Sequence, residues 1–365
     1  MSAFFFLAGL CFSSWASRIP SIQQNLHLDN AALGGVLFSL PVGLMTSLPL
    51  AGWLVARFGS RPVAIAGAVL YATTLPVLGL VSAAWQLVAC LFCFGMFGNL
   101  LNISINTQAV GTEALYGRTI MASYHGLWSL AGFAGATIGG AFIGLGWRPW
   151  QHFLVITGMA YFLIILLSRR LIARDAAHRG NQPIFARPDR SLVNLGIIAF
   201  CSMICEGAMF DWSNVYFQKI ILPPKALAGI GLTAFMSTMA SGRFLGDWLA
   251  TKWGIRRMLQ FSGTLTATGL LLAICFPWLF PALMGFLFVG AGVSSVVPLV
   301  YSAAGRSKVL SPGVALAAVS TIGYLGFLFG PPFIGFIAQV SSLRVSLGLI
   351  AILGSMIALF AARIK

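Results

Sequence analysis

Side chains able to do chemistry are scarce in this chain, because only 8% of its 365 residues are charged and 59% are hydrophobic. Glu206 stands out, since it lies inside a long apolar stretch between Cys205 and Gly207. An ionisable group in such surroundings is costly, so its presence indicates a functional role. We expect Glu206 to carry a proton or to accept a hydrogen bond from a bound molecule. The alternative is a packed carboxylate that is hydrogen-bonded to a neighbouring helix.

Two further charged residues are expected near one end of the apolar stretches. Asp211 follows Glu206 by five residues, which places it about 140° further around a helix. It could cap or gate the outer mouth, or contact a ligand directly. Arg18 lies at the outer end of the first apolar stretch. Its depth along the chain makes it a candidate partner for Asp211.

Three asparagines form a polar stripe within one apolar stretch. Asn99, Asn102 and Asn106 fall at roughly 0°, 300° and 340° around a helix that turns about 100° per residue. Such a stripe favours a water-filled cavity over hydrogen bonds between helices. Amides both donate and accept hydrogen bonds, which suits ligands that carry many hydroxyl groups.

His125 could serve as a proton relay or contact a ligand, or it could be a neutral histidine hydrogen-bonded between helices. The rings of Trp15, Trp128 and Tyr324 could stack on a sugar or an apolar ligand, with core packing as the alternative. We expect no metal site, because no second histidine or carboxylate stands at ligand spacing beside His125. No catalytic constellation or cofactor-binding motif is expected, since His-Glu-x-x-His, Gly-x-Ser-x-Gly and the P-loop pattern are all missing from the sequence.

The elements that carry these residues are long apolar stretches, each of which can cross a bilayer. A spanning helix needs about 20 apolar residues, because hydrocarbon offers no water to satisfy the backbone. The sequence therefore predicts an all-α membrane protein with twelve spans. They are 3–24, 31–56, 61–82, 85–110, 118–144, 149–169, 192–216, 226–251, 256–276, 281–304, 312–340 and 343–362. Pro331 and Pro332 predict a break or bend in the eleventh span.

The basic residues predict the orientation. Of 22 lysines and arginines, one (Arg243) lies inside a span and five lie on the predicted outer side. The other 16 fall on the predicted inner side: Arg57, Arg61, Arg118, Arg169, Arg170, Arg174, Arg179, Arg187, Arg190, Lys252, Arg256, Arg257, Arg306, Lys308, Arg363 and Lys365. This asymmetry places both termini in the cytoplasm. It also accounts for the net charge of +15 without a nucleic-acid partner.

The chain divides into two halves that repeat one another. The longest polar segment, 171–191, separates a bundle of six spans at 1–170 from a second bundle at 192–365. The segment that begins at Gly52 aligns without gaps with the segment that begins at Asp247, at a spacing of 195 residues. Each copy carries a Trp-Leu pair, then a cation, an aromatic residue, a glycine and an arginine. Parallel repeats of this kind are typical of transporters.

The first copy of the repeat resembles the basic loop that marks the major facilitator superfamily. In that family the loop reads roughly Gly-x-x-x-Asp-Arg-x-Gly-x-Arg. Gly52, Arg57, Gly59 and Arg61 match this pattern, whereas Ala56 stands at the position of the aspartate. The resemblance implies two pseudo-symmetric six-helix bundles and a gating role for the loop.

The second copy keeps Gly254 and Arg256 of the same motif. Arg243 and Asp247 are four residues apart, so they share a helix face and could pair. Such a pair would substitute for the missing aspartate, and a simple structural ion pair is the alternative.

Four further stretches are similar to a branch of bacterial inner-membrane proteins that includes MosC and is related to the fucose–proton symporter group. The stretches are 14–20, 125–130, 205–212 and 321–324, the last followed by a Gly-Pro-Pro at 330–332. The resemblance implies a multi-pass protein of the bacterial inner membrane.

These patterns together predict a secondary transporter and not an enzyme. We expect it to move a small solute by alternating access with coupling to protons, as a monomer in the lipid bilayer. A polar, sugar- or cyclitol-like solute is favoured by the asparagine stripe. The runner-up is a proton-coupled exporter of drug-like or amphipathic compounds. Remote alternatives are a membrane sensor and an intramembrane enzyme.

Overall fold

The computed structural model describes residues 1–116, 121–172, 190–224, 227, 229–304 and 312–364. A few side chains within helices, including that of Asp247, fall outside the described part. All regular structure in the described ranges is helical. The chain forms two compact units, Met1–His178 with Leu222–Thr233, and Arg179–Ile221 with Ala234–Lys365.

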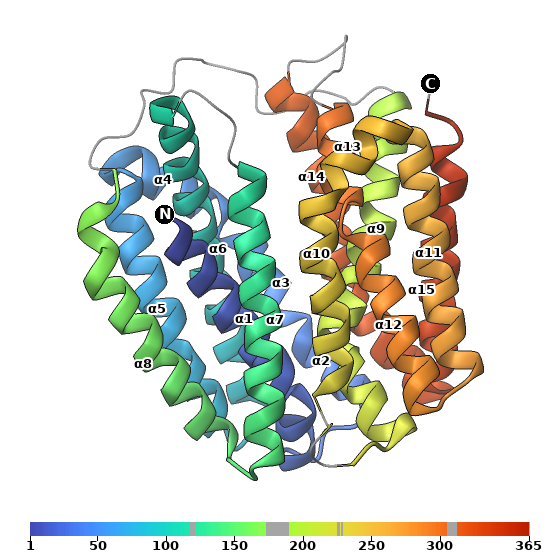
Figure 1. The fold of residues 1–365 in the computed structure, drawn as a ribbon. Helices are drawn as coiled ribbons and strands as arrows, with labels where there is room; N and C mark the ends of the chain where they lie inside the picture. Colours follow the sequence, from blue (N-terminus) through green and yellow to red (C-terminus); the bar gives the residue numbers. More distant parts are fainter. Residues whose placement is uncertain (117–120, 173–189, 225–226, 228, 305–311, 365) are drawn as a thin grey trace. The chain divides into compact units, whose positions relative to one another are not determined.

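The first unit is a bundle of apolar helices (Figure 1). They are α1 Ser2–Asn25, α2 Asn30–Leu37, α3 Ser39–Thr46, α4 Leu48–Phe58, α5 Ser60–Leu80, α6 Ala84–Tyr116, α7 Met121–Gly144, α8 Pro149–Leu167 and the short η1 Ser168–Arg170. α1 packs against both α7 and α8, and α5 packs against α6 and α8. α1 is therefore enclosed on several sides, and most of its residues are buried.

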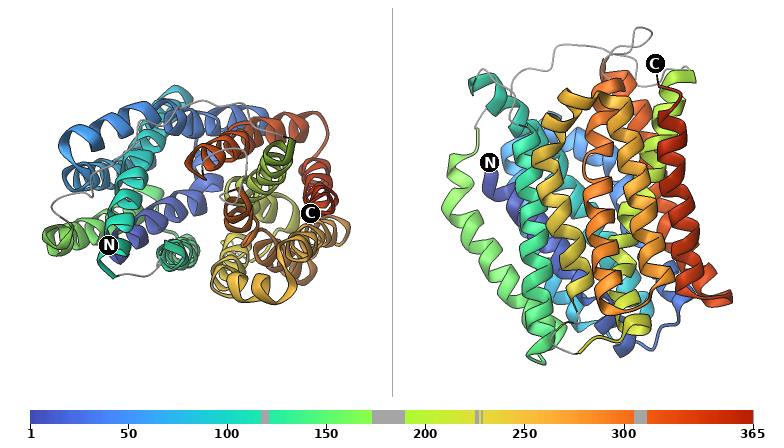
Figure 2. Two further views of the ribbon diagram at one scale, coloured as in Figure 1. Left: turned by 90° about the horizontal axis from the view of Figure 1, so that it is seen from above. Right: turned by 45° about the vertical axis from the view of Figure 1, so that its right-hand side comes forward.

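The second unit is built in the same manner, with its helices side by side (Figure 2). They are α9 Arg190–Tyr216, the π-helical turn η2 Phe217–Ile221, most of α10 Ile230–Trp253, α11 Ile255–Cys275, α12 Leu279–Val293, α13 Val296–Ala304, α14 Pro312–Val340 and α15 Leu343–Ala361. α9 packs on α14 and α15, and α11 packs on α12 and α15. α9 is the most enclosed candidate span of this unit among those described.

Two predicted spans are not continuous helices. The span predicted at 31–56 is divided into α2, α3 and α4, with breaks at Phe38 and Ser47. Pro41 and Pro49 follow these breaks and lack the N–H that would continue the helical ladder across them. The span predicted at 281–304 is divided into α12 and α13 at Ser294, four residues before Pro298. Proline chemistry at the start of a helical turn thus explains both interruptions.

The eleventh predicted span behaves differently. Pro331 and Pro332 lie inside α14, which continues as a helix from Pro312 to Val340. The break that this proline pair predicted is therefore absent. Neighbouring helices and local adjustments can compensate for the lost backbone hydrogen bonds inside a packed bundle.

Eleven helical segments in the described part of the chain are long and apolar enough to cross a membrane. They match eleven of the twelve predicted spans. The remaining predicted span corresponds to α10, which is long enough at 24 residues. Its sequence contains Arg243 and Asp247, which make it less apolar than the others.

Candidate functional site

An ion pair inside the second unit joins α9 to α10. Arg243 Nη2 lies 3.3 Å from Glu206 Oε1, and this contact is also a hydrogen bond donated by the guanidinium. The two side chains are only 8% (Glu206) and 16% (Arg243) exposed. Removing either partner would leave a buried charge without compensation, which costs far more than the pair gains. The two buried side chains therefore depend on each other for their stability.

Two tyrosines bring hydroxyl groups to the same place. Tyr301 of α13 and Tyr324 of α14 both lie close enough to Glu206 for its charge to act on their phenol groups. The Tyr301 hydroxyl is buried, and Ser320 lies near it. Four helices of one unit thus contribute a carboxylate, a guanidinium and two phenols. We name Glu206, Arg243, Tyr301 and Tyr324 the polar cluster.

Glycines bring α14, which carries Tyr324, close to α9, which carries Glu206. A Cβ atom added at Gly326 would lie 2.6 Å from the Phe200 carbonyl oxygen, so only glycine fits there. A Cβ atom at Gly323 would lie 2.9 Å from the sulfur of Met203. Small residues at such positions let helix backbones approach closely within a membrane.

Asp211 lies on α9 beyond the polar cluster and is half-buried. The next residue, Trp212, is fully buried. The predicted pairing of Asp211 with Arg18 stays a prediction. So does the predicted Arg243–Asp247 pair, because the Asp247 side chain lies outside the described part, and the partner the structure gives Arg243 is Glu206.

Arg18 forms a separate buried site in the first unit. Its Nε donates to Nδ1 of His152 over 3.2 Å, and its Nη1 donates to the Trp147 carbonyl oxygen over 2.9 Å. The guanidinium is 2% exposed, and its Nη2 is buried without a hydrogen-bond partner. Because His152 accepts at Nδ1, its proton resides on Nε2 when Arg18 is charged. Arg18 therefore fastens α1 to the start of α8.

The aromatic candidates of the first unit differ in exposure. Trp15 is 1% exposed, and its indole N–H has no acceptor among the described residues. Trp128 is half-buried and lies against Phe12, with ring centroids 5.9 Å apart. His125 is exposed and meets the Phe5 ring edge-on at 5.5 Å. Trp15 is thus part of the packed core, whereas His125 is open to its surroundings.

The three asparagines of α6 do not share one environment. Asn99 is 3% exposed and donates to Ser47 Oγ over 2.8 Å, so it supports the break between α3 and α4. Asn106 donates to the backbone and side-chain oxygens of Asn102, at 2.8 and 2.9 Å. Asn102 is exposed and Asn106 is half-buried. Only the part of the stripe at Asn102 and Asn106 is open to a ligand.

The two copies of the basic motif have the same local geometry. Gly59 has φ 85° and ψ 157°, and Gly254 has φ 79° and ψ 155°. Positive φ with extended ψ is a conformation that only glycine adopts readily. Arg57 stacks over Trp53 at 5.4 Å, and Lys252 lies 4.0 Å over Trp248. Each glycine makes the turn into the next helix, so the repeat seen in the sequence is also a repeat in structure.

The remaining motif residues lie at the surface. Gly52 and Arg256 are exposed, and Arg61 is half-buried at the start of α5.

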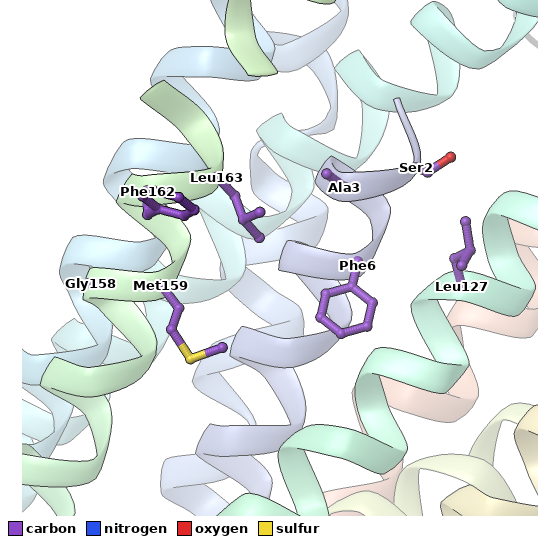
Figure 3. A pocket seen from close by; sticks show the side chains of 8 residues that line it. All are labelled: Ser2, Ala3, Phe6, Leu127, Gly158, Met159, Phe162 and Leu163. Carbon is purple, nitrogen blue, oxygen red and sulfur yellow. The ribbon is translucent and has the colours of Figure 1, made fainter. Parts of the chain in front are cut away.

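An apolar hollow of about 750 Å³ lies among α1, α7 and α8 of the first unit. Phe6 projects into it from α1, and Met159, Phe162 and Leu163 project from α8 (Figure 3). None of the predicted site residues lines this hollow. Its apolar walls suit an acyl chain better than a polar solute.

Sequence reasoning missed Tyr301 and His152. His152 had a detectable signal, because it is an ionisable residue at the start of an apolar stretch. Tyr301 had none, since tyrosines occur at many positions in membrane helices. In the described part of the chain, no cluster of three histidine, cysteine, aspartate or glutamate side chains could hold a metal ion.

Sequence comparison places the chain among transporters. A family model described as Major Facilitator Superfamily matches residues 1–308. An uncharacterised transporter of this type from Yersinia pestis is 33% identical over 349 residues, which cover 96% of this chain and 91% of the relative. The membrane protein MosC of Rhizobium meliloti is 30% identical over 358 residues, covering 97% and 86%.

Solved structures show the same fold. The nucleoside transporter NupG superposes with a TM-score of 0.76 at 14% identity, covering 100% of this chain and 98% of its own. The Escherichia coli fucose–proton symporter FucP superposes with a TM-score of 0.65 at 15% identity, covering 99% and 96%. At such low identity these likenesses concern the fold alone.

Proposed function

We propose that this chain, which belongs to the major facilitator superfamily, is a secondary transporter that moves a small polar solute by alternating access and couples this movement to protons. Its relatives are named as transporters, so it is a membrane protein and not an enzyme. The observation that carries the coupling proposal is the buried Glu206–Arg243 pair.

The pair gives proton coupling a physical basis. While Glu206 is ionised, it is held by Arg243 in surroundings where neither charge can be solvated. Uptake of a proton by Glu206 removes this attraction, and Arg243 then lacks an ionic partner until the side chains rearrange. Tyr301 and Tyr324 lie within electrostatic range of the carboxylate and can respond to its change of charge. Protonation of Glu206 therefore shifts the equilibrium of the second unit between two arrangements of these side chains. Such a shift is what proton coupling requires.

The substrate class follows from the polar groups that the helices offer. In the first unit, the exposed Asn102 and the half-buried Asn106 provide hydrogen-bond donors and acceptors without a net charge. Such groups match a solute with several hydroxyls, such as a sugar or cyclitol. A drug-like amphipathic compound is the alternative that a substrate panel would reveal.

The proposed topology has twelve spans with both termini in the cytoplasm of a bacterium, and the protein acts as a monomer in the inner membrane. The eleven candidate spans and α10 supply the twelve crossings. The bacterial relatives support the location. The basic residues on alternate loops support the orientation.

Transport by purified protein in liposomes tests the proposal. A panel of radiolabelled hexoses, pentoses and inositols is offered across an imposed pH gradient, and we expect at least one to accumulate until a protonophore dissipates the gradient. For that solute, Glu206→Gln should reduce gradient-driven accumulation at least about tenfold. Exchange of labelled for unlabelled solute should continue, because glutamine resembles the protonated carboxyl group.

Asp29→Asn is the matched control, since Asp29 is an exposed acid that caps α2 and asparagine caps equally well. It should leave both activities unchanged. If Glu206→Gln retained gradient-driven accumulation with an unaltered pH profile, Glu206 would not be the coupling group.

A further inference from the structure

A large groove opens at one end of the second unit. Its volume is about 1700 Å³. The first turns of α9 and α11 and the last turns of α10, α13 and α15 form its walls. All of these helix ends are on the cytoplasmic side in the proposed topology.

Four arginines from three helices line this groove. Arg190 begins α9, Arg256 and Arg257 lie in the first turn of α11, and Arg363 follows α15. The described residues that line the groove include no carboxylate. None of the four forms an ion pair with a described acid, since the ion pair of the described residues is the one between Glu206 and Arg243. The groove therefore presents concentrated positive charge.

The helix termini strengthen this charge. α9 and α11 both begin at the groove, and the first turn of a helix carries partial positive charge on its free N–H groups. The groove thus combines guanidinium groups with two helix N-termini. An anion with several oxygen atoms is the ligand that such a site prefers.

Beside the arginines, the lining is partly apolar and also includes Ser191, Asn194, Thr251 and Ser302. Trp253 and Phe360 border the groove, and Arg363 lies over the Phe360 ring at 4.9 Å. Asn194 donates to the Phe360 carbonyl oxygen over 3.2 Å, so α9 and α15 are tied together at the groove floor. Arginines above an aromatic wall at a helix end match a molecule whose phosphate is attached to hydrocarbon chains.

We propose that this basic groove binds the headgroup of an anionic phospholipid from the cytoplasmic leaflet. The phosphate contacts the arginines, and the acyl chains run down past Trp253 and Phe360. This inference rests on the proposed orientation for the choice of leaflet, but it is independent of solute transport and of Glu206.

Orientation alone does not require such an arrangement. The positive-inside rule is satisfied by cations at any place in the inner loops. Arg57 satisfies it while stacked on Trp53 and Phe58, and Arg169 and Arg170 satisfy it in an exposed turn after α8. The four arginines of the groove lie around one hollow, which the positive-inside rule does not require. Binding of an anionic ligand explains this placement.

Lipid binding to the purified full-length protein in neutral detergent tests the proposal. Native mass spectrometry gives apparent affinities for phosphatidylglycerol and for phosphatidylcholine with the same acyl chains. We expect phosphatidylglycerol to bind at least about tenfold more tightly. The variant Arg257→Ala/Arg363→Ala should weaken that binding at least about tenfold, because each arginine near an anionic headgroup contributes substantially.

Two further variants separate the groove from general charge. Arg169→Ala/Arg170→Ala removes the same charge elsewhere on the same side and should leave phosphatidylglycerol binding within about twofold. Arg257→Lys/Arg363→Lys keeps the charge and should retain most of the binding, which also shows that the fold tolerates change at these positions.

Three results would overturn the proposal. Equal losses in the two double-alanine variants would mean that diffuse positive charge attracts the lipid. Equal affinity for phosphatidylcholine, which has no net charge, would mean that the net negative charge of the headgroup does not contribute to binding. Displacement of phosphatidylglycerol by millimolar inorganic phosphate would mean that the groove binds a free anion and not a lipid.

Discussion

Glu206 and Arg243 illustrate how a charge survives inside an apolar bundle. Each carries a formal charge that the membrane interior cannot solvate, and each is stabilised by the other at 3.3 Å. The sequence singles out both residues, because an ionisable group within an apolar stretch is conspicuous. The sequence does not show that the two residues interact, because they are 37 positions apart and meet only through the packing of α9 on its neighbours.

Stability measurements on this pair test its energetics. Arg243→Ala should destabilise the protein by about 3–5 kcal/mol, because it leaves the Glu206 carboxylate buried alone. The double variant Glu206→Gln/Arg243→Gln should be more stable than Arg243→Ala, since no buried charge remains. Thermal unfolding in detergent at neutral pH compares the variants. If the losses of Glu206→Gln and of Arg243→Gln, each measured alone, simply added up in the double variant, the two side chains would not act as a pair.

Arg18 presents a second buried charge with a different partner. Its guanidinium holds His152 and the Trp147 carbonyl at the same time, which a planar group with several donors can do. Arg18→Lys keeps the charge but has a single ammonium at the end of its chain. We expect a loss of about 1–3 kcal/mol, because at least one buried acceptor is left without a donor.

The matched control is Arg148→Lys, which changes an exposed arginine in the neighbouring loop. It should leave the unfolding temperature unchanged. A similar loss in both variants would mean that exchanging arginine for lysine is costly in itself, independently of the His152 contact. His152→Phe should mimic the loss in Arg18→Lys, since it removes the acceptor from the other side.

At the scale of the helix, apolar length predicts where spans lie but not whether they are continuous. Predicted bounds such as 3–24 and 343–362 are close to those of α1 and α15. The second span nevertheless divides into three helices, and Asn99 supports the break at Ser47 from α6. That contact depends on tertiary packing. In α14, by contrast, two prolines remain within one helix, so the break that they predicted is absent while the predicted bend stays a prediction.

Contacts between helices explain why the candidate site was only partly predictable. The prediction of an asparagine stripe placed all three side chains in one environment along α6. In the structure, Asn99 donates a hydrogen bond to Ser47 between α3 and α4, whereas Asn102 is exposed. Angular position on a helix is readable from the sequence. Which helix covers that position depends on the arrangement of the bundle, and a single sequence does not contain it in readable form.

The approach of α14 to α9 can be tested with two glycines of one helix. Gly326→Ala should destabilise the protein by about 1–3 kcal/mol, because the new methyl group would lie 2.6 Å from the Phe200 carbonyl oxygen and force the helices apart. Gly330→Ala is the control, since its Cβ would meet Ile204 at an ordinary 3.4 Å. It should be neutral or slightly stabilising, as alanine favours helix. Equal effects in the two variants would contradict close packing at Gly326.

The whole molecule is organised as a repeat, and its two copies were readable from the sequence because their spacing is constant at 195 residues. The structure adds that each copy closes with the same backbone conformation at Gly59 and at Gly254. Each copy also places a cation over a tryptophan one turn earlier. The charged sites are not repeated in this way among the described residues, since the second unit pairs Arg243 with Glu206 and the first unit pairs Arg18 with His152. The repeat therefore describes the scaffold, while the charged sites differ between halves.

The two turn glycines offer a test of this equivalence. Gly59→Ala and Gly254→Ala should each destabilise the protein by about 1–3 kcal/mol, because φ near 80° with ψ near 155° is strained for any residue with a Cβ atom. The space around Gly254 is open, with no heavy atom within 4 Å of an added Cβ, so the loss there reports backbone strain and not a clash. Gly52→Ala, at an equally open helical position, should cause no loss. Thermal unfolding of the three variants decides the matter. Since the two glycines belong to separate compact units, similar losses would show that both halves use one turn chemistry, and a tolerated alanine at either position would contradict it.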